Sequence, residues 1–370
     1  MIDKRKSTSS GHLGSLTVFE SEALDSLREK IPDILNQSNQ SEHSLWGTIL
    51  RVSGQASHID SEKEDIILLK FLRARDFDVL QATEMLFKCI AWRIAEKIEK
   101  IYSERLPDFC QGHDEYDAGR DRFNRPILLT RFGDMDAKQV FGNVNTFVRY
   151  RVAVFERGIQ SILPLEHGKP ETLCCIQDFA RLSVLSHSNM FKNCIEAIAA
   201  VLGNNYPEWN GISIYINFPT ALSILLGIAM MLLSEKTRSK VLILREGDYL
   251  KLLEIIAPGQ LYIEYGGLKE KENNYWRTDG EYRVINASSE IKFHVLEIPT
   301  GSHKIIVQAR SLWGEMKVKI FCNSEKIYSK KIEDPITINF QIQGPAQISI
   351  SWENTSYFNS KIALFRAQIS

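Results

Sequence analysis

The 370-residue sequence lacks the features that mark several large classes of protein. Its six cysteines form no CxxC pair, which argues against a disulfide framework or a zinc ribbon. Its longest strongly apolar run, 221–233, has only thirteen residues, whereas a membrane-spanning helix needs about 20. The first residues contain no apolar segment typical of a secretion signal. We therefore expect reduced thiols and a cytoplasmic protein that is soluble or peripherally membrane-associated.

An excess of charge of either sign is also missing, because 45 Lys and Arg face 46 Asp and Glu. A balanced chain has no overall field to attract nucleic acid, so any basic site has to be local. The apolar fraction of 44% is that of a globular protein and excludes disorder throughout. At about 150 residues per domain, the length predicts two or three domains.

The common catalytic motifs are absent as well. The chain contains no GxxxxGK[ST], GxSxG or HExxH, and no GxGxxG after a strand. The eight histidines form no pair with the spacing of metal ligands. Cys174 and Cys175 lie in an apolar run without a nearby cation, which favours a buried structural role over a nucleophile. The sequence therefore predicts no enzyme activity, no metal site and no cofactor.

The residue pattern divides the chain into five parts. They are a mostly flexible N-terminal arm with one helical stretch at 21–35, a helical lobe, an α/β domain, a polar linker and an all-β domain, at 1–57, 58–104, 105–268, 269–274 and 275–370.

The α/β prediction depends on short apolar runs that alternate with helical patterns. The expected strands are 126–132, 173–179, 212–218 and 241–244, and the expected helices are 144–163, 188–202 and 220–233. Such alternation is typical of a largely parallel sheet.

In the last part the hydrophobic period changes to two. The expected strands there are 304–308, 317–321, 336–341, 347–352 and 362–367, which predicts an all-β sandwich.

The segment 221–233 is apolar around its whole circumference, unlike a surface helix of a soluble domain. Three interpretations are open: it belongs to the central core, it is a membrane-contacting gate over a pocket, or it is an oligomer interface. Gly227 and Met230–Met231 make the segment adaptable, which suits an element that moves or meets lipid.

Two charged residues frame this segment. Glu208 comes just before the strand expected at 212–218, and Lys240 just before the strand expected at 241–244. Since consecutive parallel strands begin at the same edge of a sheet, we expect the two side chains to meet. The pair is either a surface ion pair worth about 0–1 kcal/mol or the polar end of a lipid cavity.

Several motifs together resemble one family. They are the LLKFLRARDFDV run at 68–79, Trp92-Arg93, Asn124-Arg125-Pro126, Tyr206-Pro207-Glu208, Asn217-Phe218-Pro219, Ser239-Lys240 and Tyr265-Gly266-Gly267. Over residues 58–268 they resemble, in order, a CRAL-TRIO domain with its helical lobe. The ISISWENTSYFNS segment at 348–360, followed by KIALF, is similar to the end of a GOLD domain. The whole chain resembles a phosphatidylinositol-transfer protein with the architecture of patellins.

The resemblance implies a function and a set of residues. It implies binding of phosphatidylinositol or a phosphoinositide and its transfer between membranes, in support of lipid signalling or membrane trafficking. Arg75 and Lys240 would neutralise the phosphate or inositol environment of the headgroup, Glu208 would orient Lys240, and Thr237 would donate a hydrogen bond to the phosphate.

The acyl chains would lie in an apolar cavity closed by a gating helix. The residues expected at this gate and cavity are Phe218, Leu222, Leu225, Leu226, Ile228, Ala229 and Leu232. The alternative function is a lipid-sensing adaptor whose GOLD-like domain recruits a protein or membrane partner.

The resemblance also has a departure. Members that bind phosphatidylcholine carry hydroxyl side chains on the strand expected at 173–179, where this chain has Leu173 and Cys175. A tyrosine expected after Arg125-Pro126 is replaced by Leu128. These changes argue against a choline lipid as a second ligand.

The C-terminal domain is weakly basic, with twelve Lys and Arg against nine Asp and Glu in 275–370. Five lysines gather on neighbouring strands: Lys317, Lys319, Lys326, Lys330 and Lys331. They either guard a sheet edge against aggregation or form a weak, salt-sensitive contact with anionic lipid.

Overall fold

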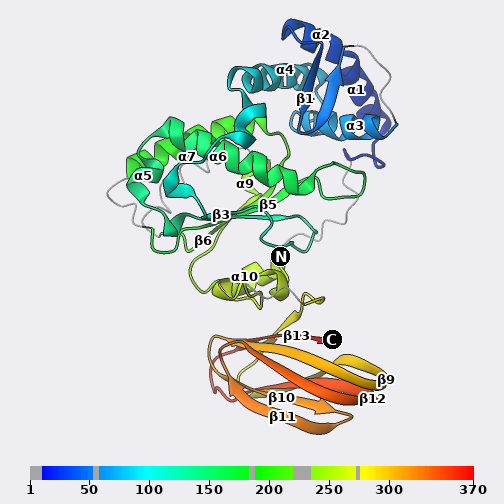
Figure 1. Cartoon of the computed structure of the whole chain (residues 1–370), viewed down its shortest axis with the longest axis vertical. Helices are drawn as coiled ribbons and strands as arrows, with labels where there is room; N and C mark the ends of the chain where they lie inside the picture. The colour runs from blue at the N-terminus through cyan, green and yellow to red at the C-terminus, as the bar shows by residue number, and fades with distance from the viewer. Residues whose placement is uncertain (1–10, 53–57, 183–187, 220–234, 272–275) are drawn as a thin grey trace. The chain divides into compact units, whose positions relative to one another are not determined.

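The computed structural model of the chain describes residues 11–52, 58–182, 188–219, 235–271 and 276–370. It divides into two compact units (Figure 1). The first comprises residues 1–118 and 123–246, and the second comprises residues 119–122 and 247–370. Among the described residues, no helix combines the length and the apolar character needed to cross a bilayer.

The first unit begins with a helical part that includes a small hairpin. Its elements are α1 (Val18–Glu29), α2 (Ile31–Gln37), β1 (Glu42–Leu45), β2 (Thr48–Arg51), α3 (His58–Arg73) and α4 (Val79–Ala95). Thr17 begins α1 with a capping box, in which its hydroxyl accepts from the Glu20 N–H and the Glu20 carboxylate accepts from the Thr17 N–H.

The prediction of a mostly flexible arm is therefore wrong for residues 18–51. The polar residues of this stretch obscured an apolar set that includes Leu27, Leu35 and Leu45, all fully buried in one core with residues of α3 and α4. Burial of these side chains supplies the free energy that orders the backbone. The single helix expected at 21–35 is two helices, α1 and α2, that meet at Lys30.

The hairpin turn carries the side chain that joins the helical part to the rest of the first unit. Trp46 has a positive φ of 48° and is only 2% exposed. Its ring centroid lies 6.5 Å from that of Phe71 and 4.7 Å from that of Trp209. Its indole N–H donates to the Glu156 carboxylate, with a nitrogen–oxygen distance of 3.2 Å.

Glu156 is a fully buried carboxylate that accepts from several parts of the unit. Besides Trp46, its donors are the Arg93 guanidinium at 2.6 Å and the hydroxyls of Tyr102 and Tyr206, both at 2.7 Å. These donors come from the hairpin, α4, the 3₁₀ helix Ile98–Ser103 and the segment before β6. A buried charge is tolerated because it is paired and hydrogen-bonded.

The predicted α/β domain is confirmed as a five-stranded sheet in the order β3-β4-β5-β6-β7. Its strands are β3 (Asp114–Glu115), β4 (Ile127–Arg131), β5 (Leu173–Asp178), β6 (Asn210–Ile216) and β7 (Val241–Ile243). The last four run parallel, and β3 pairs with β4 antiparallel.

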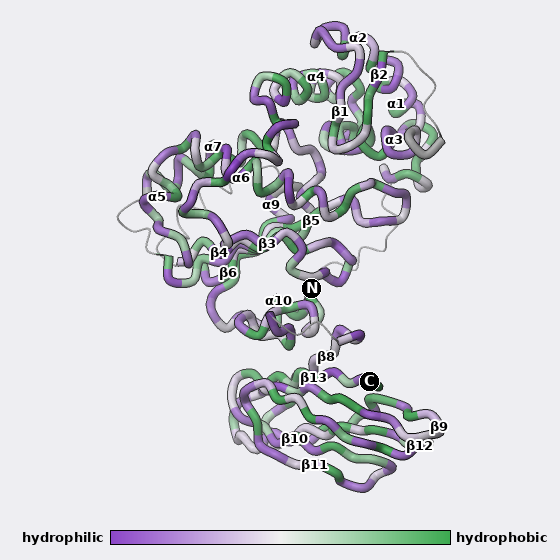
Figure 2. Tube along the Cα trace, viewed as in Figure 1, coloured by the Kyte–Doolittle hydropathy of each residue, from purple (hydrophilic) through white to green (hydrophobic). Residues whose placement is uncertain are grey.

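Among the described residues, the first unit also contains the α-helices α5 (Ala137–Phe141), α6 (Val144–Ile159), α7 (Ser188–Asn205) and α9 (Glu235–Arg238). The predictions at 144–163 and 188–202 are confirmed by α6 and α7, whereas the predicted helix at 220–233 lies outside the described residues. Figure 2 shows the apolar strands of the sheet beside these helices. Gly158 of α6 allows a close approach, since a Cβ there would lie 3.0 Å from Leu128 of β4.

The C-terminal part is all-β, as predicted, and forms one antiparallel sheet in the order β11-β10-β12-β9-β13-β8. Its strands are β8 (Glu281–Ile285), β9 (Ser289–Leu312), β10 (Met316–Cys322), β11 (Glu325–Ile332), β12 (Ile336–Asn354) and β13 (Lys361–Ile369). The strands expected at 336–341 and 347–352 are two parts of β12. The sequence did not predict β8 and β11, because each of these two edge strands buries only one side chain and lacks a clear apolar face.

The long strands let the sheet fold back on itself and enclose a core. Phe293 lies in the first half of β9, whereas Phe365 lies in β13, which pairs with the second half. Their ring centroids are nevertheless only 4.6 Å apart. One buried cluster therefore contains residues from both halves of the folded sheet, including Trp352, which pairs with the first half of β9, and Ile305 in the second half of β9. One continuous sheet thus encloses a buried core between its two halves, as the two separate sheets of a sandwich do.

The second unit also contains the segment 247–268, which the sequence analysis placed in the lipid-binding domain. This segment includes α10 (Tyr249–Ile255) and the 3₁₀ helices Pro258–Gln260 and Ile263–Tyr265. The Arg310 guanidinium donates to the carbonyls of Ile263 at 2.6 Å and Gly267 at 3.0 Å. Side chains of the all-β part thus hold the segment in place.

We expect Glu156→Gln to destabilise the first unit by about 3–5 kcal/mol, because it leaves the buried Arg93 without its buried charged partner. Urea unfolding followed by tryptophan fluorescence would measure the loss. The control is Glu84→Gln, which removes an exposed carboxylate paired with Lys88 and should change the free energy of unfolding by about 0.5 kcal/mol or less. If the two variants unfolded at the same urea concentration, the result would contradict a central role for Glu156.

Candidate functional site

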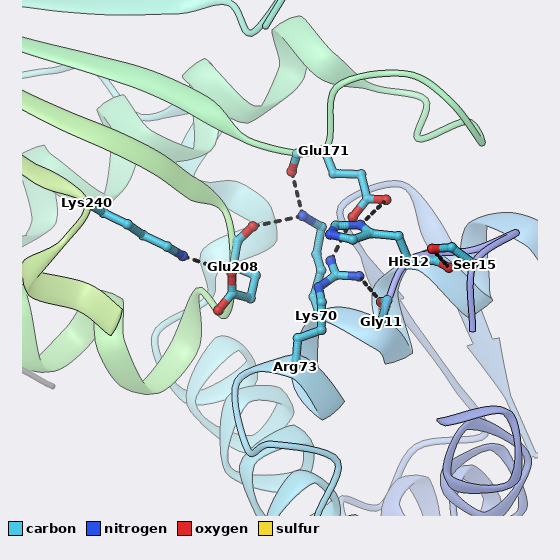
Figure 3. A network of polar contacts seen from close by, with 8 residues as sticks. All are labelled: Gly11, His12, Ser15, Lys70, Arg73, Glu171, Glu208 and Lys240. Atoms are coloured by element: carbon cyan, nitrogen blue, oxygen red, sulfur yellow. Dashed lines mark hydrogen bonds and ion pairs between the residues drawn. The ribbon is translucent and has the colours of Figure 1, made fainter. Parts of the chain in front are cut away.

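Three charged residues come just before three neighbouring parallel strands of the first unit. Glu171 precedes β5, Glu208 precedes β6 and Lys240 precedes β7. Parallel strands begin at one edge of a sheet, so the topology brings these residues to the same edge. Figure 3 shows them beside α3 and the segment that contains His12.

The expected meeting of Glu208 and Lys240 is confirmed. The Lys240 ammonium donates to Glu208 Oε2 at 2.8 Å, and the two side chains of Lys240 and Glu208 are 25% and 16% exposed. Glu208 has a positive φ of 53°, which is uncommon for a residue other than glycine. The pair is thus well formed and partly open to solvent.

Lys70 of α3 lies beneath this edge and is completely buried. Its ammonium donates to the carbonyl oxygens of Glu171 at 2.5 Å and Glu208 at 3.1 Å, and lies 4.1 Å from the centre of the Trp209 ring. Burial lowers the pKa of Lys70 to about 7, although the charges of Glu171 and Glu208 oppose this shift. One side chain thus ties the starts of β5 and β6 to α3.

Arg73 follows Lys70 by three residues on the same face of α3. Its guanidinium contacts the Glu171 carboxylate at 2.7 Å and donates to the Gly11 carbonyl at 2.8 Å. His12 Nδ1 lies 3.3 Å from the other carboxylate oxygen of Glu171. Burial raises the pKa of Glu171, but the His12 hydrogen bond and the charges of Arg73 and Lys70 outweigh it and hold the pKa at about 2.

Among the described residues, the network pairs the cationic side chains of Arg73 and Lys240 with the carboxylates of Glu171 and Glu208. Lys70, with its pKa lowered to about 7, adds further positive charge whenever its amine is protonated. A partly exposed sheet edge with an ammonium donor is suited to binding a phosphate or another small anion.

Arg75 lies elsewhere in this region. It is half-buried in the turn after α3, and its guanidinium donates to the Ala74 carbonyl at 2.8 Å. Together with Lys88, its charge lowers the pKa of Glu84. From the same run at 68–79, Figure 3 draws Lys70 and Arg73 in the network. A headgroup role for Arg75 stays a prediction.

The predicted gate lies mostly outside the described residues. This holds for Leu222, Leu225, Leu226, Ile228, Ala229 and Leu232, and for the side chain of Thr237, whose backbone belongs to α9. Phe218 is described and is 5% exposed. Its ring centroid lies 5.0 Å from that of Phe179 and 6.0 Å from that of Tyr215. An aromatic cluster thus lies just before the gate segment.

The five lysines of the second unit differ in their surroundings. Lys319 is paired with Glu290 at 3.0 Å and with Glu353 at 2.8 Å. Lys317 lies 3.8 Å from Glu353, and Lys331 lies 3.4 Å from Glu315. Lys326 and Lys330 are exposed on the edge strand β11. Glutamates therefore offset much of the predicted positive charge.

The sequence analysis missed Lys70, Arg73, Glu171 and His12. Lys70 and Arg73 lie inside the 68–79 run that resembles the helical lobe of a CRAL-TRIO protein, and their spacing alone puts them on one helix face. Glu171 precedes β5 as Glu208 precedes β6, so the same topological argument applies to it. No sequence signal marks His12.

We expect Glu171→Gln to lower the free energy of unfolding at pH 7 by about 2–3 kcal/mol, because the folded-state pKa lies well below the unfolded value. This contribution is present above about pH 4.5 and is lost as the pH falls toward 2. Denaturant unfolding at a series of pH values would therefore show the wild-type and variant curves converging in acid. Glu166→Gln, on the same loop and exposed, is the control and should leave the pH profile unchanged. Parallel curves for wild type and Glu171→Gln would contradict the network.

Comparison with known proteins places this site in a family. The model of the CRAL/TRIO domain matches residues 111–267, and that of the CRAL/TRIO N-terminal domain matches residues 23–88. The second match includes part of α1, all of α2 and the hairpin, in agreement with the folded N-terminal part.

Curated relatives extend the similarity over most of the chain. Patellin-6 of Arabidopsis thaliana is 28% identical over 96% of this chain and 88% of its own length. Patellin-4 of the same plant is 32% identical over 71% of this chain, which spans about half (48%) of that protein. The phosphatidylinositol transfer protein SFH5 of Saccharomyces cerevisiae is 24% identical over 69% of this chain and 88% of its own length.

A solved structure supports the fold independently. The crystal structure of Sfh5 superposes with a TM-score of 0.58 at 24% identity, over 70% of this chain and 90% of that chain. The two domain models match consecutive parts of the chain in the order that the sequence motifs predicted. The chain therefore belongs to the CRAL/TRIO family.

Proposed function

We propose that the protein binds phosphatidylinositol or a phosphorylated derivative and transfers it between membranes. The observation that carries this proposal is the Glu208–Lys240 ion pair at the start of β6 and β7, within a CRAL/TRIO domain. It is supported by the similarity to a protein named as a phosphatidylinositol transfer protein and by the patellin relatives.

The headgroup phosphate would bind at Lys240. An ammonium group has three donors, and the Glu208 carboxylate holds that of Lys240 at the sheet edge. Lys70 and Arg73 add positive charge behind it, which lowers the cost of taking a phosphate out of water. Arg75 and Thr237 complete the proposed headgroup set.

The acyl chains would occupy an apolar cavity closed by the segment 220–233. Phe218 and its aromatic neighbours supply an apolar surface directly before that segment. No covalent bond is made in this mechanism. The gate opens at a bilayer, the lipid exchanges, and closure shields the acyl chains from water.

We expect the double variant Lys240→Ala, Glu208→Ala to reduce transfer of radiolabelled phosphatidylinositol between vesicles by about tenfold or more, equivalent to at least about 1.4 kcal/mol of binding. The matched control is Lys192→Ala, Glu196→Ala. It removes an exposed lysine–glutamate pair on α7 in which the charged atoms are 3.7 Å apart, and transfer should stay at the wild-type rate. Wild-type transfer by the Lys240 and Glu208 double variant would refute the headgroup site.

The five lysines of the second unit form a separate proposed contact. Because Lys317, Lys319 and Lys331 are ion-paired, attraction to anionic lipid would come mainly from Lys326 and Lys330. This attraction would be weak and largely screened at physiological salt, where the Debye length is about 8 Å.

We expect Lys326→Glu, Lys330→Glu to remove any preference of the full chain for phosphatidylserine vesicles at low salt, as measured by co-sedimentation. The control, Lys97→Glu, Lys100→Glu, reverses two exposed lysines of the first unit and should keep the preference. If the Lys326 and Lys330 double variant still preferred phosphatidylserine vesicles, these lysines would not bind lipid. Their remaining role would be to protect the β11 edge from pairing with another chain.

A further inference from the structure

The exposed large apolar side chains of the second unit gather at one end of its sheet. Within its described part, the side chains of this kind are Val284, Ile291, Trp313, Tyr357 and Phe358. Tyr357 and Phe358 are the most exposed, at 83% and 93%. Single exposed apolar residues are ordinary on a protein surface, whereas a group of them marks a contact site.

Strand pairing explains why these positions meet. The last residue of β8 pairs with the first residue of β13, and the last residue of β12 pairs with the first residue of β9. Because the sheet folds back on itself, the end of β9 also lies beside the start of β13, where Leu312 pairs with Ile362. The β8–β9 turn, the β9–β10 turn and the loop 355–360 therefore share one end, which we call the aromatic end.

The loop that carries the two most exposed rings is held by hydrogen bonds. Asn354 is 1% exposed, and its amide donates to the carbonyls of Ile285, Asn286 and Asn359. Its side-chain oxygen accepts from the Ser356 N–H at 3.1 Å. In addition, the Ser288 N–H donates to the Ser356 carbonyl at 2.8 Å. The loop is thus ordered by its own polar groups, while its two aromatic rings stay in solvent.

Charges of both signs surround the aromatic end. Lys361 begins β13, and its ammonium donates to the Glu315 carbonyl at 2.6 Å. Lys317 lies 3.8 Å from Glu353, one residue before Asn354. The rim thus carries ammonium and carboxylate groups close together, rather than charge of one sign, and so matches the phosphate and amine of a zwitterionic headgroup.

We propose that the aromatic end inserts Tyr357 and Phe358 into the interface of a lipid bilayer. Aromatic side chains favour this zone because their rings are apolar and the tyrosine hydroxyl stays hydrated. The tip is a protruding pair of rings, and its mixed charges fit lipid headgroups. These features favour a bilayer over a protein groove as the occupant. The inference rests on the proposed function, because lipid exchange requires the protein to contact a membrane.

The test measures binding of the full chain to phosphatidylcholine vesicles by co-sedimentation at low and physiological salt. We expect Tyr357→Ala, Phe358→Ala to weaken binding by about tenfold at both salt concentrations, since the lost contribution is apolar burial. The matched control is Val18→Ala, Phe19→Ala, which removes apolar side chains of the first unit that are 76% and 63% exposed; its binding should equal wild type.

A second measurement locates the tip directly. In a Phe358→Trp variant, brominated phosphatidylcholine should quench additional tryptophan fluorescence relative to wild type. Vesicle binding by the Tyr357 and Phe358 double variant at wild-type strength, or no additional quenching at position 358, would overturn the proposal. So would a double variant that keeps its vesicle affinity but loses a purified protein partner, because the tip would then be a protein contact.

The test also separates this inference from the proposed function. The Tyr357 and Phe358 double variant should retain phosphatidylinositol in the purified protein, as measured by mass spectrometry, while losing vesicle affinity. Loss of the lipid from the Lys240 and Glu208 double variant, with vesicle affinity intact, is the result expected for the headgroup site.

Discussion

The first unit depends on a fully buried lysine side chain. Lys70 donates to the backbone carbonyls at the starts of β5 and β6 and packs against the Trp209 ring. A buried cation with unsatisfied donors would cost several kcal/mol, so its partners have to stay in place. They are the backbone of Glu171 and Glu208, whose side chains contact Arg73 and Lys240. The same interaction therefore secures α3 to the sheet and fixes the edge at which we propose headgroup binding.

A second buried charge gives the N-terminal residues their place in the fold. Glu156 accepts from Trp46 of the hairpin turn and from Arg93 of α4. The Trp46 ring also contacts Trp209, which lies over Lys70. The two buried side chains are thus linked through a pair of tryptophan rings.

The second unit solves a different problem, which is how a sheet with two polar edges obtains a core. Its long strands fold back so that Phe293 meets Phe365, and its edge strands β8 and β11 carry charged side chains. Lysines on β11 discourage pairing with another chain. In the described part of this unit, the large apolar side chains that remain exposed lie at the end where Asn354 orders a loop.

The sequence by itself determined the α/β domain, the all-β C-terminal part and the meeting of Glu208 with Lys240. In each case the determining property is local: apolar runs of strand length, a period of two, and the rule that parallel strands begin at one edge. Only the tertiary structure decided that residues 18–51 are folded, that Lys70 is buried and that Glu171 joins the network with His12. The N-terminal residues become ordered by burying side chains against distant α3 and α4, and the role of Lys70 depends on carbonyls about 100 and 140 residues away. Interactions between groups that far apart leave no periodic trace in the sequence, because they depend on how the elements pack rather than on how each one forms.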